Sequence, residues 1–573
     1  MASLISSLNT SGALGNTALT HFDFVMIGSG AGGSAAAAIL AKNGKRVLIL
    51  EAGPNYFLNL DHPDPKQVGN AFSNDTLKLT RRNFLIPDPL LEPRTFRHGE
   101  RDGHRKFVGE FNAMPRTVGG GAVHAGLNLP RFLPQDFRLG SLLGEVPGAN
   151  FADWPVDYDQ LEPFYEYVEE NMGVQGQAGL TPFEGPRRKP YPMGPGVPMY
   201  VSLKAAQGAE KLGYHPFPYP AGVNSKNFDG RPACVDCGFC NQFGCPTNAK
   251  GSPAVTTLRK ALLTGNVLLL PETKVIRLQT SSSGREIVGI EALDASGEKK
   301  IYQGDQYILS AGTIENVRIL LFSDKNGVGV GNQNGLVGRN IMFHLKTYGV
   351  GIFSERLHGH RGRTLSHGIA DFRGVAGDSS RPLGGIVEFG GGLDPVDEAL
   401  SYANQMGMSG GLIKALMEQS PFRDRLMVLT MHGEDAPQLS NRVDLDPEVK
   451  DIDGVPAGRT TYKNHAFELE AQKHYQPKLL EIVGKAGAKY GISPPRDLMP
   501  KTHHLLGTLR MGKNAASSVC DPLGRFHGVG NLLVADGSLL PTSSGFNPTL
   551  TIAALAARVG AGLIHPQSPE SAL

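Results

Sequence analysis

The chain has 573 residues, of which 40% are hydrophobic and 19% charged, and its formal net charge is +2 at neutral pH. A chain of this length exceeds the size at which one hydrophobic core usually stops growing, so two domains are expected. The balanced charge provides no electrostatic case for a nucleic-acid partner, which requires a concentrated basic face.

The sequence contains no recognisable targeting or membrane-spanning segment. Residues 1–20 lack both a basic start and a sustained apolar run, so they do not resemble a cleaved signal. No window reaches about 18 consecutive apolar residues, so no membrane span is expected. The pair Arg81-Arg82 resembles a twin-arginine signal but lies too far inside the chain. We therefore expect a cytoplasmic protein, with export to the periplasm attached to a signal-bearing partner as the open alternative.

A strand–turn–helix–strand unit begins near residue 22. Residues 22–27 are a short apolar run typical of a buried parallel strand, and a glycine-rich turn at 28–33 follows. An alanine-rich helix is predicted over 34–41 and a second strand over 46–50, ending at Glu51. This arrangement predicts a dinucleotide-binding site, because it joins G-x-G-x-x-G to the flanking elements that the motif requires.

Each glycine of the turn has a physical role in such a site. Gly28 makes the turn, Gly30 lets the backbone approach a pyrophosphate, and Gly33 lets helix and strand pack closely. The helix N-terminus then faces the phosphates, and Glu51 can accept hydrogen bonds from ribose hydroxyls. The motif does not distinguish NAD from FAD, because both cofactors use the same turn.

Four of the five cysteines, Cys234, Cys237, Cys240 and Cys245, lie within twelve residues. Their spacing is C-x2-C-x2-C-x4-C-P, one residue longer in the last gap than the ferredoxin run. Three interpretations are open: an iron–sulfur centre, a structural zinc site that these spacings would make cramped, and a thiol-rich or disulfide-bonded flap without metal. A reducing cytoplasm would disfavour disulfides.

A series of further motifs runs from residue 22 to residue 560. They are found at 23–54, 118–128, 308–321, 337–344, 441–447, 504–508, 534–538 and 547–552. In order and spacing these motifs resemble the glucose–methanol–choline (GMC) oxidoreductase family, which binds FAD. Within the family, residues 153–174 and His124 are most similar to bacterial sugar dehydrogenases and related sugar oxidases. Those dehydrogenases have a differently spaced cysteine motif, whereas residues 244–252 fit the pattern of members without a cluster.

The resemblance implies how FAD is held. It assigns to the flavin the loop that contains Gly119, Gly120, His124 and Asn128. The remaining cofactor-binding positions that it implies are Val275, Asp536, Gly537, Asn547 and Thr549. In some sugar oxidases of the family the histidine corresponding to His124 carries the flavin covalently, and an aromatic residue usually follows it. Here Ala125-Gly126 follow, so we expect non-covalent FAD, with a covalent link at His124 as the alternative.

The resemblance also implies the reacting groups. The family places a catalytic histidine at H-x-x-G-T, here His504, and a histidine or asparagine before P-T-L-T, here Asn547. An imidazole suits the base that removes a hydroxyl proton, whereas an amide can only orient the substrate oxygen. His503 is the competitor for the role of base. Neighbouring side chains of an extended segment point to opposite sides, and the family spacing selects His504.

The expected fold is α/β, with a discontinuous Rossmann-like FAD-binding domain and an α+β substrate domain built on an antiparallel sheet. The predicted parts of the FAD domain are 1–195 with a lid or insertion at 55–110, 225–340 with a cysteine-rich flap at 234–252, and 501–573 with the active-site residues. The predicted parts of the substrate domain are an excursion at 196–224 and the main body at 341–500.

The predicted function is oxidation of a sugar or other alcohol by an FAD-dependent dehydrogenase that passes electrons to a non-NAD acceptor, with an electron-accepting protein or small subunit as a partner. An oxidase that uses oxygen, and a lyase that retains FAD without net redox chemistry, are the alternatives within the family. A non-catalytic flavoprotein subunit is a further alternative, and the pair His504 and Asn547 argues against it.

Overall fold

The computed structural model describes residues 12–60, 92–103, 115–241, 243–324, 327–378, 380–392, 398–399, 402–403, 406–494, 500 and 502–573, together with the backbone of 107–109. Much of the predicted lid at 55–110, including Arg81-Arg82, lies outside these ranges. No helix in the described part of the chain is long and apolar enough to cross a membrane.

A six-stranded, mainly parallel sheet forms the centre of the nucleotide-binding part. Its strands in spatial order are β1 (Leu14–Gly15), β7 (Val267–Leu270), β3 (Val47–Leu50), β2 (Phe24–Ile27), β11 (Gln306–Leu309) and β21 (Leu532–Val534). Every neighbouring pair is parallel except β1 and β7. Every residue of β2 and β3 is buried, as expected for parallel strands covered on both faces. The strands come from both ends and the middle of the chain, which confirms a discontinuous Rossmann-like sheet.

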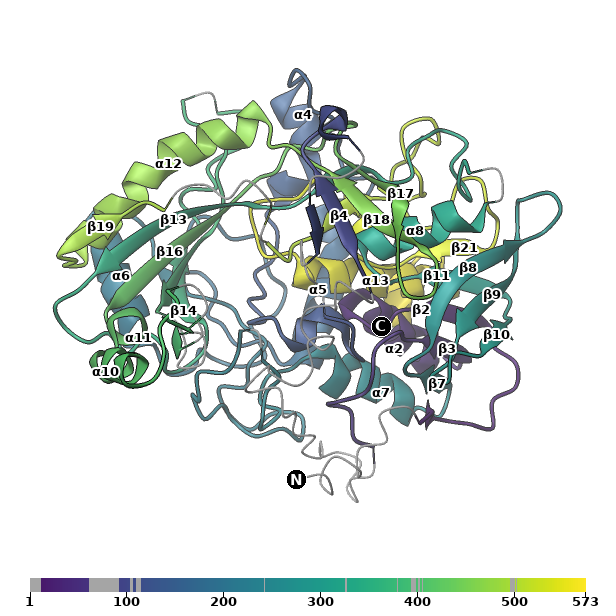
Figure 1. Cartoon of the computed structure of the whole chain (residues 1–573), viewed down its shortest axis with the longest axis horizontal. Helices are drawn as coiled ribbons and strands as arrows, with labels where there is room; N and C mark the ends of the chain where they lie inside the picture. Colours follow the sequence, from purple (N-terminus) through teal and green to yellow (C-terminus); the bar gives the residue numbers. More distant parts are fainter. Residues whose placement is uncertain are drawn as a thin grey trace.

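Four helices lie beside this sheet (Figure 1). Of these, α2 (Ala31–Lys42) and α7 (Thr257–Leu263) contact its strands, α13 (Thr549–Ile564) packs on α2, and α5 (Tyr158–Met172) packs on α13. The two alanine-rich helices α2 and α13 approach each other closely, because small side chains line their contact. A Cβ atom on Gly560 would lie only 2.9 Å from the Ala36 carbonyl oxygen. This close packing joins two helices from opposite ends of the chain.

A second six-stranded sheet is entirely antiparallel. Its strands in order are β19 (Tyr490–Ile492), β13 (Leu345–Ile352), β16 (Leu426–Gly433), β15 (Val387–Gly391), β14 (Leu365–Ile369) and β6 (Phe217–Pro218). The helices α12 (Ala466–Lys485) and α6 (Tyr200–Glu210) cover it, and α12 follows its outer side in Figure 1. Burial alternates along β13, because one face packs against a helix. The expected combination of a Rossmann-like domain and an antiparallel substrate sheet is therefore confirmed.

A third sheet joins distant parts of the chain. Its strands in order are β20 (Leu506–Thr508), β12 (Arg339–Met342), β17 (Arg442–Lys450), β18 (Pro456–Thr461), β4 (Arg94–Arg97) and β5 (Phe107–Gly109). The strands within residues 341–500, the predicted main body of the substrate domain, are thus divided between two sheets. The boundaries of the substrate domain therefore stay a prediction. The remaining elements are β8 (Lys274–Thr280), β9 (Ile287–Leu293), β10 (Lys299–Tyr302), α4 (Leu139–Leu143), α8 (Thr313–Ser323), α10 (Gly411–Gln419) and α11 (Pro421–Asp424).

Two buried carboxyl groups lie close together where α12 meets the end of β16. Glu468, in the first turn of α12, accepts hydrogen bonds from the backbone of His465 and Ala436. Asp435 accepts the Tyr462 hydroxyl at 2.8 Å. Burial raises the pKa of Glu468 to about 7, and burial together with the neighbouring Glu468 raises the pKa of Asp435 well above its ordinary value. The pair therefore retains protons that the unfolded chain would release.

We expect Glu468 to contribute a loss of stability as pH rises from 5 to 8. A carboxyl whose pKa is raised by folding stabilises the fold below its unfolded pKa, and this contribution is lost as pH rises through about 7. The loss is at most about 3 kcal/mol. Glu468→Gln keeps the hydrogen-bond acceptor but cannot ionise, so its thermal midpoint should decline less over this range. Glu470→Gln, at an exposed site of the same helix, is the control. Parallel declines for Glu468→Gln and the unmodified protein would contradict this assignment.

Candidate active site

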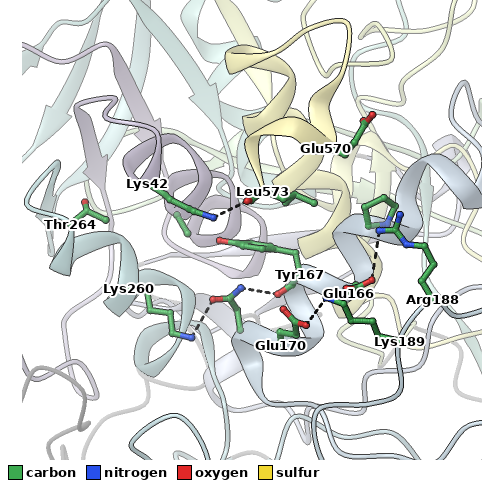
Figure 2. A pocket seen from close by; sticks show the side chains of 13 residues that line it. Lys42, Glu166, Tyr167, Glu170, Arg188, Lys189, Lys260, Thr264, Glu570 and Leu573 are labelled. Atoms are coloured by element: carbon green, nitrogen blue, oxygen red, sulfur yellow. Dashed lines mark hydrogen bonds and ion pairs between the residues drawn. The ribbon is translucent and has the colours of Figure 1, made fainter.

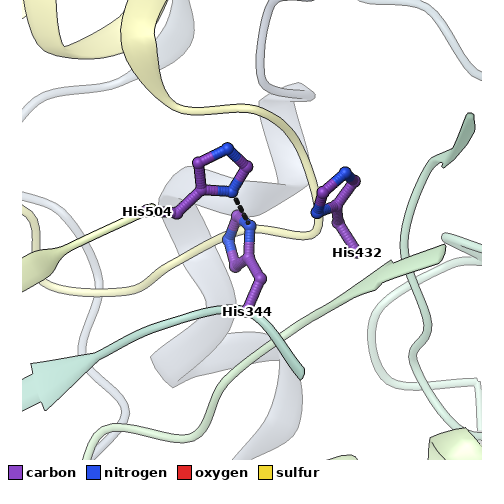
Figure 3. A group of neighbouring side chains, drawn as sticks. All are labelled: His344, His432 and His504. Carbon is purple, nitrogen blue, oxygen red and sulfur yellow. Dashed lines mark hydrogen bonds between the residues drawn. The ribbon is translucent and has the colours of Figure 1, made fainter. Parts of the chain in front are cut away.

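Three histidine side chains from separate elements lie together between the sheets (Figure 3). His344 lies between β12 and β13, His432 lies within β16, and His504 precedes β20. The Nδ1 atoms of His344 and His504 are 2.9 Å apart, and the rings of His432 and His504 have centroids 5.0 Å apart. Of these three histidines, the sequence prediction named only His504 as catalytic; its other catalytic residue was Asn547. His503 is exposed, while His504 belongs to the cluster, as expected from alternation along an extended segment.

A hydrogen-bond chain assigns the protonated nitrogen of each ring. The His344 Nε2 lies 3.2 Å from the Ser543 carbonyl oxygen, which can only accept, so Nε2 carries the hydrogen. Burial lowers the pKa of His344 to about 3, so the ring is neutral and its Nδ1 must accept. The donor is the Nδ1–H of His504, whose pKa burial also holds well below its ordinary value. Neutral His504 therefore has an unprotonated Nε2, the atom that a general base requires.

The amide of Asn547, just before α13, is oriented by two hydrogen bonds. The Tyr219 hydroxyl donates to its Oδ1 at 2.6 Å, and its Nδ2 donates to Glu388 Oε1 at 3.1 Å. Because the oxygen is engaged and the nitrogen carries two hydrogens, one N–H is left for a further acceptor. Asn547 can therefore donate a hydrogen bond to a substrate oxygen.

Glu388 links the antiparallel sheet to the nucleotide-binding part. It is opposite Thr430 in the pairing of β15 with β16, which puts His432 two residues along on the same face. Its Oε2 lies 3.1 Å from His432 Nε2, and its Oε1 also accepts Asn128 Nδ2 at 2.7 Å. Burial raises the pKa of Glu388, but His432, Lys346 and Asn547 together outweigh this and hold it below the ordinary value. Asn128, predicted to contact FAD, thus lies beside the catalytic candidates.

Sequence reasoning missed four residues of this network: Tyr219, His344, Glu388 and His432. His344 was noted only at the end of a family motif, although a histidine there was a usable signal. Glu388 interrupts a buried apolar strand, which is the kind of exception that often marks a site. His432 and Tyr219 carry no local signal, because only sheet pairing brings them near Asn547.

The glycine-rich turn fits the diphosphate of a dinucleotide. Gly28 has a φ of +98°, which favours glycine, and a Cβ on Gly33 would lie 2.4 Å from the Gly28 carbonyl oxygen. Helix α2 starts after Gly30 with no side-chain cap and no acidic residue in its first turn. Its first N–H groups are therefore available to an anion. A Cβ on Gly30 would meet only the Gly120 Cα, at 3.9 Å, so space for the ligand lies in front of the helix.

The predicted flavin loop packs directly against this turn. Gly119 N donates to Ser29 Oγ at 3.0 Å, and Gly120 has a φ of +64°. Ser29 in turn donates to Glu51 from both its backbone, at 3.0 Å, and its hydroxyl, at 2.6 Å. Burial raises the pKa of Glu51. Glu51 thus holds the turn in shape, and its predicted contact with ribose stays a prediction.

The other residues that the sequence predicts to bind the cofactor lie in separate loops, a helix start and a strand. Asp536 accepts hydrogen bonds from Gly312 N and Asn316 Nδ2, both at 2.8 Å, which ties its loop to α8. A Cβ on Gly537 would lie 2.9 Å from the Leu505 carbonyl oxygen, next to His504 in the chain. Thr549 is the first residue of α13. His124 is buried with its ring edge-on to Phe57, and Val275 lies in β8, two residues after Thr273, which donates to the Glu51 carbonyl at 2.8 Å.

The cysteine-rich segment is tied to the loop that contains His124. Lys250 Nζ donates to the carbonyl oxygens of Cys240, Phe243 and Ala125, at 2.6, 2.8 and 2.9 Å. The four cysteines of the segment form no disulfide. Burial raises the pKa of Cys234 to about 11 and that of Cys240 to about 12. Among the described residues, no three of these sulfur atoms lie within 4.8 Å of one another, the arrangement that one ion would need.

A surface pocket lies elsewhere, between α2, α5, α7 and the C-terminus (Figure 2). Its charged side chains pair with one another: Lys189 contacts Glu170 at 3.2 Å, and Lys42 donates to the Leu573 oxygen at 2.8 Å. None of the predicted site residues lines it. The candidate site is therefore the histidine cluster together with the glycine-rich turn, which offer an imidazole nitrogen, an amide N–H and the first N–H groups of α2.

Comparison with known proteins agrees with this geometry. Residues 198–346 and 437–556 match the family described as GMC oxidoreductase, and residues 26–70 match an NAD(P)-binding Rossmann-like domain. The chain is 30% identical over 553 residues to 6'''-hydroxyparomomycin C oxidase of Streptomyces lividus, covering 95% of this chain and 91% of the relative. The chain belongs to the GMC oxidoreductase family. It is therefore an FAD flavoprotein that oxidises CH–OH donors, as predicted.

Other similarities extend along the whole of this GMC oxidoreductase. It is 28% identical over 568 residues to the fructose dehydrogenase large subunit of Gluconobacter japonicus, covering 95% of this chain and 98% of the relative. The fold is similar to the crystal structure of pyridoxine 4-oxidase from Mesorbium loti, with a TM-score of 0.62 and 18% identity over 95% of this chain and 99% of that one. The structural similarity supports the fold, and the sequence similarity supports the enzyme class.

Proposed function

We propose that this GMC oxidoreductase oxidises a sugar or related alcohol with His504 as the base and Asn547 as the donor that orients the substrate oxygen. The observation that carries the proposal is the chain from the Ser543 carbonyl through His344, which leaves His504 Nε2 unprotonated. His504 Nε2 accepts the hydroxyl proton, and Asn547 Nδ2–H bonds the same oxygen. When bound, FAD accepts the hydride from the carbinol carbon.

The proposed cofactor is non-covalent FAD, held by the turn at 28–33 and the loop at 118–128. Two small residues follow His124, and a Cβ on Gly126 would already lie 2.6 Å from Thr364 Oγ1. A bulky side chain at position 126 therefore has no room here, and the aromatic residue that usually follows the flavin-linked histidine in the enzymes that this loop resembles is absent. A covalent link at His124 is the alternative, and it would leave the flavin attached to denatured protein.

The proposed acceptor is a non-NAD molecule or protein, which makes the enzyme a dehydrogenase. Similarity to a protein named as the large subunit of a fructose dehydrogenase supports an additional electron-accepting subunit. An iron–sulfur centre is one interpretation of the four cysteines, whose C-x2-C-x2-C-x4-C-P spacing is one residue longer than the ferredoxin run. Such a centre would carry electrons between flavin and acceptor. Cys234, Cys237, Cys240 and Cys245 would hold it. A metal-free flap is the alternative, which iron and sulfide analysis distinguishes.

The proposal predicts that substrate bleaches the visible flavin absorption without added acceptor. FAD-loaded protein is mixed anaerobically with ketoses, aldonic acids, vicinal diols and amino sugars, because Asn547 and His504 recognise only the reacting hydroxyl. We expect at least one class to bleach the flavin, and a quinone to restore the colour faster than dioxygen does. Faster recovery with dioxygen would favour an oxidase. Product formed while the flavin stays oxidised would identify a lyase and refute the proposal.

A further inference from the structure

We propose that His344, His432 and His504 form a binding site for a divalent transition-metal ion such as Zn²⁺, and that the bound ion prevents His504 from acting as a base. One ring nitrogen from each histidine lies within 4.8 Å of those from the other two (Figure 3). Imidazole nitrogens are preferred ligands of zinc, copper and nickel ions. The metal-binding part of the inference is independent of the proposed function, whereas the inhibition rests on it.

The outward-facing nitrogens of two rings have the partners that metal-binding histidines usually have. His344 Nε2 donates to the Ser543 carbonyl at 3.2 Å, and His432 Nε2 lies 3.1 Å from Glu388 Oε2. Such partners orient the ring and direct its other nitrogen toward the ion. The 2.9 Å between the Nδ1 atoms of His344 and His504 is close enough for both to bind one ion after a small displacement. Three histidines would leave a fourth position for water.

The surroundings favour a cation in this place. His344 and His432 are 2% exposed each, so a ligand there exchanges little with solvent. A metal ion binds the neutral form of imidazole, through the lone pair of one ring nitrogen. The carboxylate of Glu388, in contact with His432, supplies a negative charge. Lys346 is paired with His432 across β13 and β16. Its positive charge repels a bound cation and limits the affinity of the site for the ion.

A bound metal ion and base catalysis exclude each other, because both change where His504 carries its hydrogen. Without metal, His504 carries its hydrogen on Nδ1, donated to His344, and its lone pair is on Nε2. An ion bound at Nδ1 takes the place of the hydrogen on that nitrogen, so the single hydrogen of the neutral ring moves to Nε2. Three metal–nitrogen bonds form and no proton is lost overall. With Nε2 protonated, His504 cannot accept the proton of an alcohol.

The test uses the FAD-loaded protein and Zn²⁺ alone. We expect calorimetry to show one ion per chain and X-ray absorption at the zinc edge to show only nitrogen or oxygen ligands at about 2.0–2.1 Å. A sulfur shell at about 2.3 Å would place the ion on the cysteines and overturn the proposal. Because these measurements use the unmodified protein, they do not depend on whether a variant folds.

Variants then locate the ion. His432→Gln and His344→Gln should each weaken zinc binding by at least about tenfold, since each removes a ligand. His21→Gln is the matched control, because His21, Asp23 and Asp305 form the other candidate group among the described residues. Unchanged affinity in both cluster variants, or lost affinity in His21→Gln, would overturn the site. Retained FAD content confirms that each variant is folded.

Inhibition is measured as the rate of flavin reduction by an active alcohol. Saturating Zn²⁺ should slow it by at least about 100-fold, the smallest usual contribution of a general base, and a chelator should restore it. Nitrogen-only zinc binding without inhibition would refute the effect on His504 and leave the site established. If His504→Gln retained full turnover, the proposed function would fail, while calorimetry would still decide whether the ion binds.

Discussion

Replacing His504 by glutamine is expected to slow flavin reduction by about 10²–10⁴-fold, because glutamine can donate and accept hydrogen bonds but cannot take up a proton. The effect should be on the rate at saturating substrate rather than on substrate affinity, since the proton is transferred only in the reaction. The measurement is anaerobic stopped-flow bleaching of the flavin, with FAD content showing that the cofactor site is intact.

The neighbouring residue provides a matched control for this result. His503→Gln changes the same side chain one position earlier, at an exposed site outside the histidine cluster. It should leave the rate within a few-fold of that of the unmodified enzyme. A loss of activity in His503→Gln with little loss in His504→Gln would show that the base has been assigned to the wrong histidine.

Gly120→Ala is expected to weaken FAD binding by at least about 30-fold, equivalent to about 2 kcal/mol. Gly120 has a φ of +64°, and an added Cβ would lie 2.7 Å from the Gly30 Cα. The flavin loop would have to move away from the phosphate-binding turn, which is the contact that forms the cradle. The measurement is FAD titration of the apoprotein, followed by flavin fluorescence.

Gly44→Ala is the control for backbone strain alone. Gly44 has a φ of +77° but no atom within 4 Å of an added Cβ, so FAD affinity should be unchanged.

Acid precipitation of the unmodified holoprotein should release the flavin into the supernatant. Full FAD occupancy in Gly120→Ala would contradict the cradle, and yellow colour retained in the pellet would indicate covalent attachment, for which His124 is the candidate.

The nucleotide-binding turn could be predicted from the sequence because its interactions are local. Gly28, Gly30 and Gly33 act within six residues, and the strands on both sides carry continuous apolar runs. In the structure β2 and β3 pair in parallel and α2 begins directly after Gly30, as expected. The role of Glu51 could not be predicted in the same way. Its carboxylate accepts hydrogen bonds from Ser29, and these depend on how the turn folds back over the end of β3.

The site around His504 could be predicted only in part. Family motifs identified His504 and Asn547, but the sequence does not contain the information that selects the tautomer of one or the amide orientation of the other. His344 is 160 positions from His504, and Tyr219 is 328 positions from Asn547. These partners come together through separate antiparallel pairings, in which a shift of one residue would turn each side chain to the opposite face.

The sequence alone determined the Rossmann-like unit, because that unit depends on a short motif whose spacing has a direct physical meaning. FAD as the cofactor and His504 as the candidate base came from the resemblance of the sequence to the GMC family. Tertiary structure decided which nitrogen of His504 is unprotonated and where the three imidazoles converge. The physical reason is that hydrogen-bond direction depends on the actual partner: a carbonyl at Ser543 can only accept, and that one contact sets the proton positions of both His344 and His504.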